Sequence, residues 1–292
     1  MIVALCAAAA VAVIVGGTLL LSRHESTTPR DAVTAPRPGR PLLQLEFGPF
    51  GSSLVQPTKL LNDGHAAAAA AIFRRYSDPE AELGLAFAQW TGASSLDRVK
   101  AIVAAHPDNP AVLLNLGWAD YQAGRNADAA TAWQETASRY PDSPYAVDAL
   151  DALHPDVAPG LPPIVVDFAA VPGGARADLQ QGWRAWNSKQ VVLARQRLNA
   201  AARLAPHSPE VLVAAAVARF SPAAPLAPFH VLGPLTATFP KDPIVRLHLG
   251  ELLLWTRQVA KGKAQLRLAI AEQPKSIYAK QAKLILKALG HT

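Results

Sequence analysis

The sequence predicts an all-α protein: an α-solenoid of about five helix pairs with a Pro- and Gly-rich insert, preceded by one transmembrane helix. Three observations support this prediction. Prolines recur at a fixed interval, glycines precede several of them at a second fixed interval, and residues 2–21 form one uncharged apolar run. Because 50% of the 292 residues are hydrophobic, the chain can bury a substantial core.

The N-terminal apolar run is predicted to span a membrane. It extends from Ile2 to Leu21, and at about 1.5 Å per helical residue its length matches the roughly 30 Å hydrocarbon core of a bilayer. A cleaved signal peptide would need a basic leader and a small-residue cleavage site, and the run has neither. We therefore expect residues 1–22 to anchor a single-pass protein in a bacterial cell membrane. The side of the membrane is left open, because the arginines after the helix favour the cytoplasm but a basic leader upstream would reverse that preference.

Composition divides the rest of the chain into four parts. Residues 23–56 combine a Pro-rich polar tether with short apolar pieces that Gly and Pro interrupt. A first repeat block is expected over 57–153, and a second block with a basic final helix over 175–292. Residues 154–174 between them are too rich in Pro and Gly for a helix pair. We interpret this insert as a linker between the blocks, with a hinge, an extended arm or a binding loop as alternatives.

Glycine and proline recur in register along both blocks. A glycine inside a helix costs about 1 kcal/mol relative to alanine, so its recurrence indicates a place where a second helix must come close. A proline lacks the backbone N–H that a helix needs, so it ends the second helix of each unit. The Gly and Pro pairs that share one sequence separation are Gly117 and Pro141, Gly182 and Pro206, and Gly250 and Pro274. The five predicted units cover residues 77–107, 110–143, 175–206, 209–240 and 243–274.

This pattern resembles the tetratricopeptide repeat, a helix-turn-helix unit of about 34 residues. The best copy is 110–143, with Leu116 and Gly117, Gly124 at the turn, Ala129, Trp133 in the place of the usual Phe, and Pro141. The resemblance implies a right-handed superhelix whose concave surface binds a protein or peptide ligand. The chain departs from the family pattern at the leading Trp position, which holds Leu113, Asp178 and Arg246.

The resemblance also places a partner-binding groove on the first helices of the repeats. Residues spaced by three, four, seven or eight positions share a face there, distinct from the face that packs internally. The candidates are Leu114, Trp118, Tyr121, Gln122, Leu179, Trp183, Trp186, Asn187, Glu251, Leu254 and Trp255. The alternative is that the large aromatic side chains fill the seam between neighbouring helices. Groove aromatics would be partly exposed without a partner, whereas seam aromatics would be buried.

The sequence predicts no catalytic residue, no cofactor and no metal site. The single cysteine, Cys6, excludes structural disulfides and cysteine-type zinc sites. The eight histidines have no metal-binding spacing, and the chain contains no GxSxG, Walker-type or GxGxxG motif. We therefore expect a protein that is not an enzyme.

The basic charge is concentrated near the C-terminus. Residues 255–292 hold eight basic residues and one acidic residue, and the net charge of the whole chain is +6. Lys280, Lys283 and Lys287 form one stripe on a helix predicted over 277–289. This stripe is expected to be the solvated outer face of the last repeat, with contact to anionic lipid or another acidic polymer as the alternative. A net charge of +6 is only mildly basic for a chain of this length and does not by itself indicate nucleic acid.

Two function classes follow. The first is a membrane-anchored scaffold that binds a partner protein or peptide in its concave groove. The alternative is an envelope-associated accessory protein, or an enzyme subunit, that binds an anionic polymer or lipid through its basic C-terminal helices.

Overall fold

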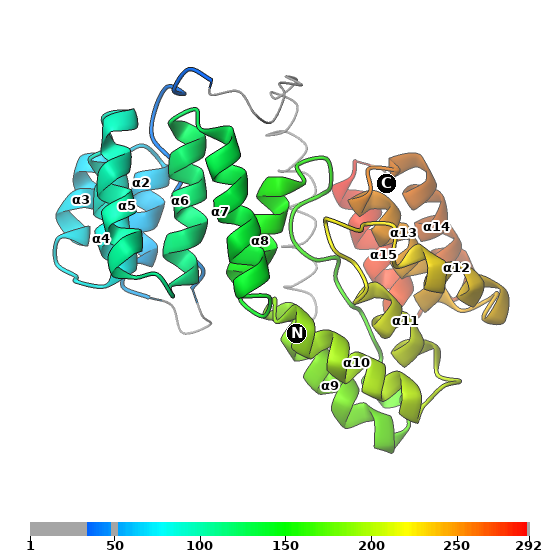
Figure 1. The fold of residues 1–292 in the computed structure, drawn as a ribbon. Coiled ribbons are helices and arrows are strands. Elements are labelled where there is room, and N and C mark those ends of the chain that lie inside the picture. The colour runs from blue at the N-terminus through cyan, green and yellow to red at the C-terminus, as the bar shows by residue number, and fades with distance from the viewer. Residues whose placement is uncertain (1–33, 48–51, 291–292) are drawn as a thin grey trace. The chain divides into compact units, whose positions relative to one another are not determined.

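The computed structural model describes residues 34–47 and 52–290, in which all regular secondary structure is helical (Figure 1). The predicted membrane anchor, residues 2–21, lies outside the described residues. Within the described part of the chain, no helix is long and apolar enough to cross a bilayer. The described residues up to Ala149 form one compact unit, and those from Leu150 onward form another. We refer to them as the first and second units.

The first unit contains three helix pairs and the start of a closing helix. The pairs are α2 (Val55–Asn62) with α3 (Ala66–Phe73), α4 (Pro79–Ala88) with α5 (Leu96–Ala105), and α6 (Pro110–Gln122) with α7 (Asn126–Arg139). A short 3-10 turn, η1 (Ala93–Ser95), precedes α5. The closing helix α8 (Pro144–Leu153) begins in the first unit and ends in the second.

The second unit repeats this plan. Its pairs are α9 (Gly173–Asn187) with α10 (Val191–Leu204), α11 (Pro209–Val217) with α12 (Phe229–Thr238), and α13 (Pro243–Trp255) with α14 (Val259–Glu272). The closing helix is α15 (Ile277–Ala288), and a 3-10 turn, η2 (Phe168–Ala170), precedes α9. The described residues therefore form one pair more than the five that the sequence predicts. The additional pair is α2 and α3, two short helices that carry neither the glycine nor the proline of the repeat pattern.

The repeat glycines permit close packing between the two helices of a pair. A Cβ atom at Gly117 would lie 2.2 Å from the Trp133 indole nitrogen. A Cβ at Gly182 would lie 2.6 Å from Leu198, and one at Gly250 would lie 2.9 Å from Leu266. In each pair a side chain of the second helix thus rests on the backbone of the first, which explains why these positions lack a side chain.

Prolines and polar caps mark the helix ends. Pro141 follows Tyr140, the C-cap residue of α7. Helix α6 starts at a proline after Asn109, whose side chain accepts hydrogen bonds from two backbone N–H groups of the first turn. Asp242 caps α13 in a similar way, accepting from one backbone N–H. The proline spacing seen in the sequence therefore reflects where helices stop and start.

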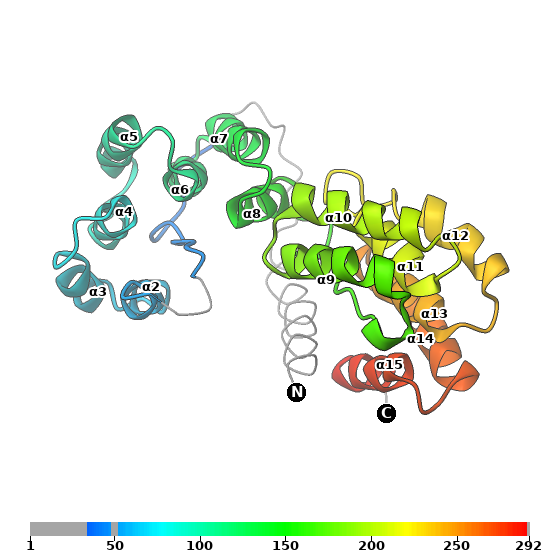
Figure 2. The ribbon, with the colours of Figure 1, turned by 90° about the horizontal axis from the view of Figure 1, so that it is seen from below.

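Each unit also has a largely extended, non-helical stretch that precedes its helix pairs in the chain and packs against them. In the first unit this N-terminal segment comprises residues 34–47, and in the second the middle segment comprises residues 155–167. Figure 2 shows the N-terminal segment, in blue, inside the curve that α2, α4, α6 and α8 form. These two segments and the side chains that hold them constitute the candidate site.

Candidate functional site: two grooves that hold extended chain

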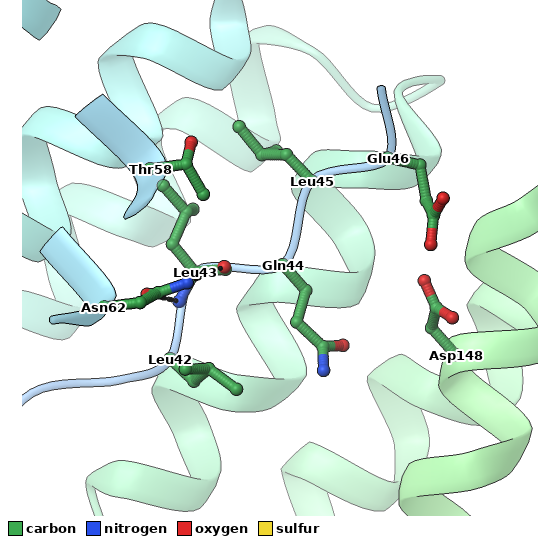
Figure 3. Close-up of a pocket in the computed structure, with 8 residues that line it drawn as sticks. All are labelled: Leu42, Leu43, Gln44, Leu45, Glu46, Thr58, Asn62 and Asp148. Carbon is green, nitrogen blue, oxygen red and sulfur yellow. Dashed lines mark hydrogen bonds between the residues drawn. The ribbon is translucent and has the colours of Figure 1, made fainter. Parts of the chain in front are cut away.

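Two asparagines of the first unit hold consecutive residues of the N-terminal segment by their main chain. The N–H of Leu43 donates to Asn62 Oδ1 at 3.1 Å, and Asn62 Nδ2 donates to the Leu43 carbonyl at 2.9 Å (Figure 3). The N–H of Gln44 donates to Asn115 Oδ1 at 2.9 Å, and Asn115 Nδ2 donates to the Gln44 carbonyl at 2.7 Å. A carboxamide pairs with the peptide group of any residue, so both asparagines recognise extended backbone.

The end of the first groove adds one more main-chain contact and one side-chain contact. The N–H of Glu46 donates to the Tyr145 hydroxyl of α8 at 3.2 Å. The Trp118 indole N–H donates to Gln44 Oε1 at 2.9 Å. Burial raises the pKa of Tyr145 to about 12, so its hydroxyl is neutral near pH 7 and can accept this N–H.

The start of the N-terminal segment lies on the turn between α6 and α7. The Arg37 guanidinium lies over the Tyr121 ring, 3.5 Å from its centre, and donates to Asn126 Oδ1 at 3.0 Å. Gln122 Nε2 donates to the carbonyls of Arg37 at 2.9 Å and Pro38 at 2.8 Å. This part of the groove therefore binds the main chain of the segment through Gln122 and makes one cation–π contact, between Arg37 and Tyr121.

Gly124 is required by the N-terminal segment rather than by the turn. Its φ is +80°, and the equivalent turns of the second unit adopt the same left-handed conformation with Lys189 and Arg257. The turn itself thus tolerates a side chain. A Cβ at Gly124, however, would lie 2.1 Å from the Thr34 carbonyl oxygen, so at this position the segment leaves no room for one.

The second unit holds the middle segment with other side chains. The N–H of Val165 donates to His248 Nε2 at 3.0 Å, and that of Asp167 donates to the Tyr278 hydroxyl at 3.1 Å. Trp183 and Trp186 donate their indole N–H groups to the carbonyls of Ile164 and Pro162, both at 2.8 Å. The start of the segment is held by Arg257, which donates to the carbonyls of Pro155 and Asp156 at 2.9 and 2.6 Å.

Two of the contacts in each unit occupy equivalent positions. Asn115 and His248 each lie two residues before the repeat glycine of their helix, and Tyr145 and Tyr278 are each the second residue of the closing helix. The sequence separation of Asn115 and Tyr145 equals that of His248 and Tyr278. Aligning the segments on these contacts superposes residues 41–47, PLLQLEF, on residues 162–168, PPIVVDF. Each stretch has a proline, an aliphatic residue at its third and fifth positions, an acid and a phenylalanine.

Burial perturbs two titratable groups of α13 beneath the second groove. His248 is fully buried, and burial lowers its pKa from 6.5 to about 4, so the ring is neutral near pH 7. Its Nδ1 lies 2.8 Å from the Ile244 carbonyl, so that nitrogen carries the proton and Nε2 accepts the Val165 N–H. Glu251 is 1% exposed, neither of its carboxylate oxygens has a hydrogen-bond partner, and burial raises its pKa well above 4.5.

A pocket of about 250 Å³ adjoins the N-terminal segment in the first unit. It is lined by residues 42–46 together with Thr58, Asn62 and Asp148. Figure 3 shows the carboxylates of Glu46 and Asp148 pointing toward each other beside the Gln44 amide. Among the described residues, no group of three or more His, Cys, Asp or Glu side chains could hold a metal ion.

The predicted groove residues fall into two environments. Trp118, Tyr121, Gln122 and Trp183 are partly exposed and contact the segments, and Asn187 is exposed at the end of α9. The remaining candidates are buried: Leu114, Leu179, Trp186, Glu251, Leu254 and Trp255. By the exposure criterion Trp186 and Trp255 lie in the core, although Trp186 also contacts the middle segment. Lys280, Lys283 and Lys287 are all exposed on α15.

Sequence reasoning missed the polar residues that hold the segments, namely Asn62, Asn115, Tyr145, His248 and Tyr278. A signal for them exists: the shared pattern of residues 41–47 and 162–168 precedes both blocks, and a polar residue occurs two positions before Gly117 and Gly250. Neither is conspicuous alone, because the two segments share only proline and phenylalanine as identical residues.

Comparison with known proteins identifies one repeat. A tetratricopeptide-repeat family model matches residues 111–143, which form α6, α7 and the turn between them. The predicted repeat type is therefore confirmed for this pair. The chain is also similar to the crystal structure of a thermophilic tetratricopeptide-repeat protein in Thermus thermophilus, with 18% identity over 81% of this chain and 97% of that one. The TM-score of 0.29 is too low to establish a shared overall arrangement. No curated protein matches the chain significantly.

Proposed function

We propose that this chain is a non-catalytic protein-interaction scaffold whose repeat grooves bind extended segments of partner proteins. One observation carries the proposal: in both units, side chains on the groove side of the helices hold an extended stretch of chain by its main-chain N–H and C=O groups. Such contacts provide affinity for extended polypeptide without requiring a particular sequence. The tetratricopeptide-repeat match of α6 and α7 supports the same function.

Affinity capture with groove variants tests this function. The full chain and the double variant Asn62→Ala, Asn115→Ala are used as bait, and captured proteins are quantified by mass spectrometry. We expect the double variant to lose partners that the unchanged chain retains. The matched control is Asn199→Ala, because Asn199 is exposed on α10, the second helix of its pair, and is not a groove candidate. Identical capture by all three proteins would refute a groove-binding scaffold.

We further propose that residues 2–21 anchor this scaffold in a membrane. The proposal rests on the length and the uncharged apolar composition of the run. Removing residues 1–22 should release the protein from the membrane fraction without loss of its helical circular dichroism signal. Retention of the truncated chain in membranes after a high-salt wash would show a second mode of attachment.

One observation favours the alternative of an anionic partner at the C-terminus. Lys280, Lys283 and Lys287 are exposed on α15, while Tyr278 and Ile285 of the same helix are buried. Each basic residue near an anionic membrane surface contributes about 1 kcal/mol. Reversing the three charges should abolish salt-sensitive binding to phosphatidylserine vesicles. If the unchanged chain does not bind such vesicles at low salt, the stripe is only a solvated surface.

A further inference from the structure

We propose that the N-terminal segment is an exchangeable occupant of the first groove. A partner's extended segment takes its place, carrying the pattern proline, any residue, aliphatic, any residue, aliphatic, acid, phenylalanine. The middle segment, in contrast, is a permanent part of the second unit. This inference rests on the proposed scaffold function and specifies which of the two grooves is available and what it accepts.

The first step concerns what the first groove recognises. Asn62 and Asn115 each make two hydrogen bonds to the main chain of one segment residue, and Tyr145 accepts one more main-chain N–H. An incoming extended peptide offers the same peptide groups, so it can replace these hydrogen bonds one for one. The groove therefore does not distinguish its own chain from another by main-chain contacts.

The second step concerns how little buried apolar surface retains the N-terminal segment. Within residues 34–47 only Pro41 and Leu43 are buried, and Leu42 is 46% exposed. The middle segment, which is of similar length, has three times as many buried residues: Val157, Ala158, Pro162, Ile164, Val165 and Val166. Because buried apolar surface is the main favourable contribution to packing, the middle segment is held far more firmly.

The third step concerns the space beside the N-terminal segment. The pocket of about 250 Å³ lies along residues 42–46, between the segment and the side chains of Thr58, Asn62 and Asp148 (Figure 3). The chain's own sequence thus leaves part of the groove unfilled. A partner with larger side chains at the positions of Leu42, Gln44 or Leu45 could fill it and compete with the resident segment.

The identity of the occupant follows from the two segments that the chain itself provides. Residues 41–47 and 162–168 occupy equivalent positions in two different grooves, and both have the pattern given above. In both, the acid is the residue whose N–H donates to the tyrosine of the closing helix. A partner segment of this pattern therefore satisfies the main-chain contacts that the two grooves share.

The experiment ejects the N-terminal segment while leaving the groove unchanged. Leu43 is 1% exposed, so Leu43→Asp places a carboxylate in an apolar site and disfavours binding of the segment in cis. The matched control is Leu42→Asp, which alters the exposed neighbour. The probe is a fluorescent synthetic peptide of residues 34–47, and fluorescence anisotropy measures its binding to each full-length protein.

We expect the Leu43→Asp protein to bind the peptide about tenfold or more tightly than the unchanged chain or the Leu42→Asp control, because a resident segment lowers the apparent affinity by the fraction of open groove. Adding Asn115→Ala should remove that gain. Equal weak binding by all proteins, or loss of the helical signal of the first unit in Leu43→Asp, would overturn exchange. If analytical ultracentrifugation showed that the unchanged chain forms a concentration-dependent dimer, the occupant of the groove would be the segment of a second copy of this chain. That result would overturn the proposal of a different partner protein.

These outcomes are separable from those of the scaffold test. If the asparagine variants lose captured partners but the opened groove binds no peptide, only exchange fails. If the opened groove binds the peptide but capture is independent of Asn62 and Asn115, exchange stands and the scaffold function fails.

Discussion

The two units place an extended segment at the same position, but they treat it differently. In the first unit the segment is held mainly by hydrogen bonds, and one of its aliphatic side chains, Leu43, is a buried member of the unit's apolar core. In the second unit Val157, Ile164 and Val165 are core residues in their own right. The same repeat architecture can therefore hold a segment in a surface groove, as in the first unit, or bury the segment as part of its hydrophobic core, as in the second.

The difference is also chemical. At equivalent positions two residues before the repeat glycine, the first unit uses the amide of Asn115 and the second uses the imidazole of His248. An amide does not titrate, whereas an imidazole does. The comparison predicts that the two units differ in stability toward side-chain truncation, in their response to pH and in retention of their segments.

The largest expected effect is the truncation of a tryptophan in the second unit. Trp186 is 2% exposed, and its N–H donates to Pro162, so Trp186→Ala should destabilise the second unit by about 3–5 kcal/mol. Trp118 is partly exposed in the first groove, so Trp118→Ala should cost less, about 1–2 kcal/mol. Hydrogen exchange of each unit measures both values. Equal costs would show that the first segment is as firmly packed as the second.

The next effect is acid sensitivity that originates at His248. Its pKa is 6.5 in the unfolded chain and about 4 in the fold, so its contribution to stability is complete above pH 6.5 and is lost as pH falls toward 4. The loss amounts to about 3 kcal/mol. His248→Asn, which copies the first unit, should remove this loss, while Asn115→His should introduce it there. The test is the free energy of unfolding as a function of pH, measured for the unchanged protein and for each variant. The acid sensitivity should disappear in His248→Asn and appear in the first unit of Asn115→His.

Glu251 should act in the opposite pH range. Burial raises its folded pKa above the unfolded value of 4.5, so its favourable state is fully present below pH 4.5 and stability falls as pH rises above it. The slope is at most about 1.4 kcal/mol per pH unit for one proton. Glu251→Gln should remove that slope in the second unit. The control is Glu46→Gln, which changes an exposed residue of the N-terminal segment and should leave the slope of the second unit unchanged. A slope that persists in Glu251→Gln would place its origin in another group.

Much of the fold could be predicted from sequence because its markers are local. A glycine such as Gly250, where a neighbouring helix leaves no space, and a proline after a helix end leave a periodic trace that one chain reveals. The pair α2 and α3 lacks both markers, so the sequence does not reveal it. The groove contacts are harder to predict because they join residues such as Gln44 and Asn115, which lie 71 positions apart. Composition marks residues 154–174 as irregular, and only the structure shows what they touch.

The smallest expected effect distinguishes side-chain from main-chain recognition by tryptophan. In the first unit the Trp118 N–H donates to the side chain of Gln44, whereas in the second the Trp183 N–H donates to a main-chain carbonyl that no substitution removes. Gln44→Ala should therefore weaken retention of the N-terminal segment by about 1 kcal/mol. That loss corresponds to about a fivefold rise in the hydrogen exchange rate of residues 41–47, with the helices of the first unit unchanged. The control Leu42→Ala removes only an exposed side chain and should not alter that rate. If the hydrogen exchange rate instead rises both in the segment and in α6, the N-terminal segment is part of the core of the first unit. The two units would then differ only in how firmly they hold their segments.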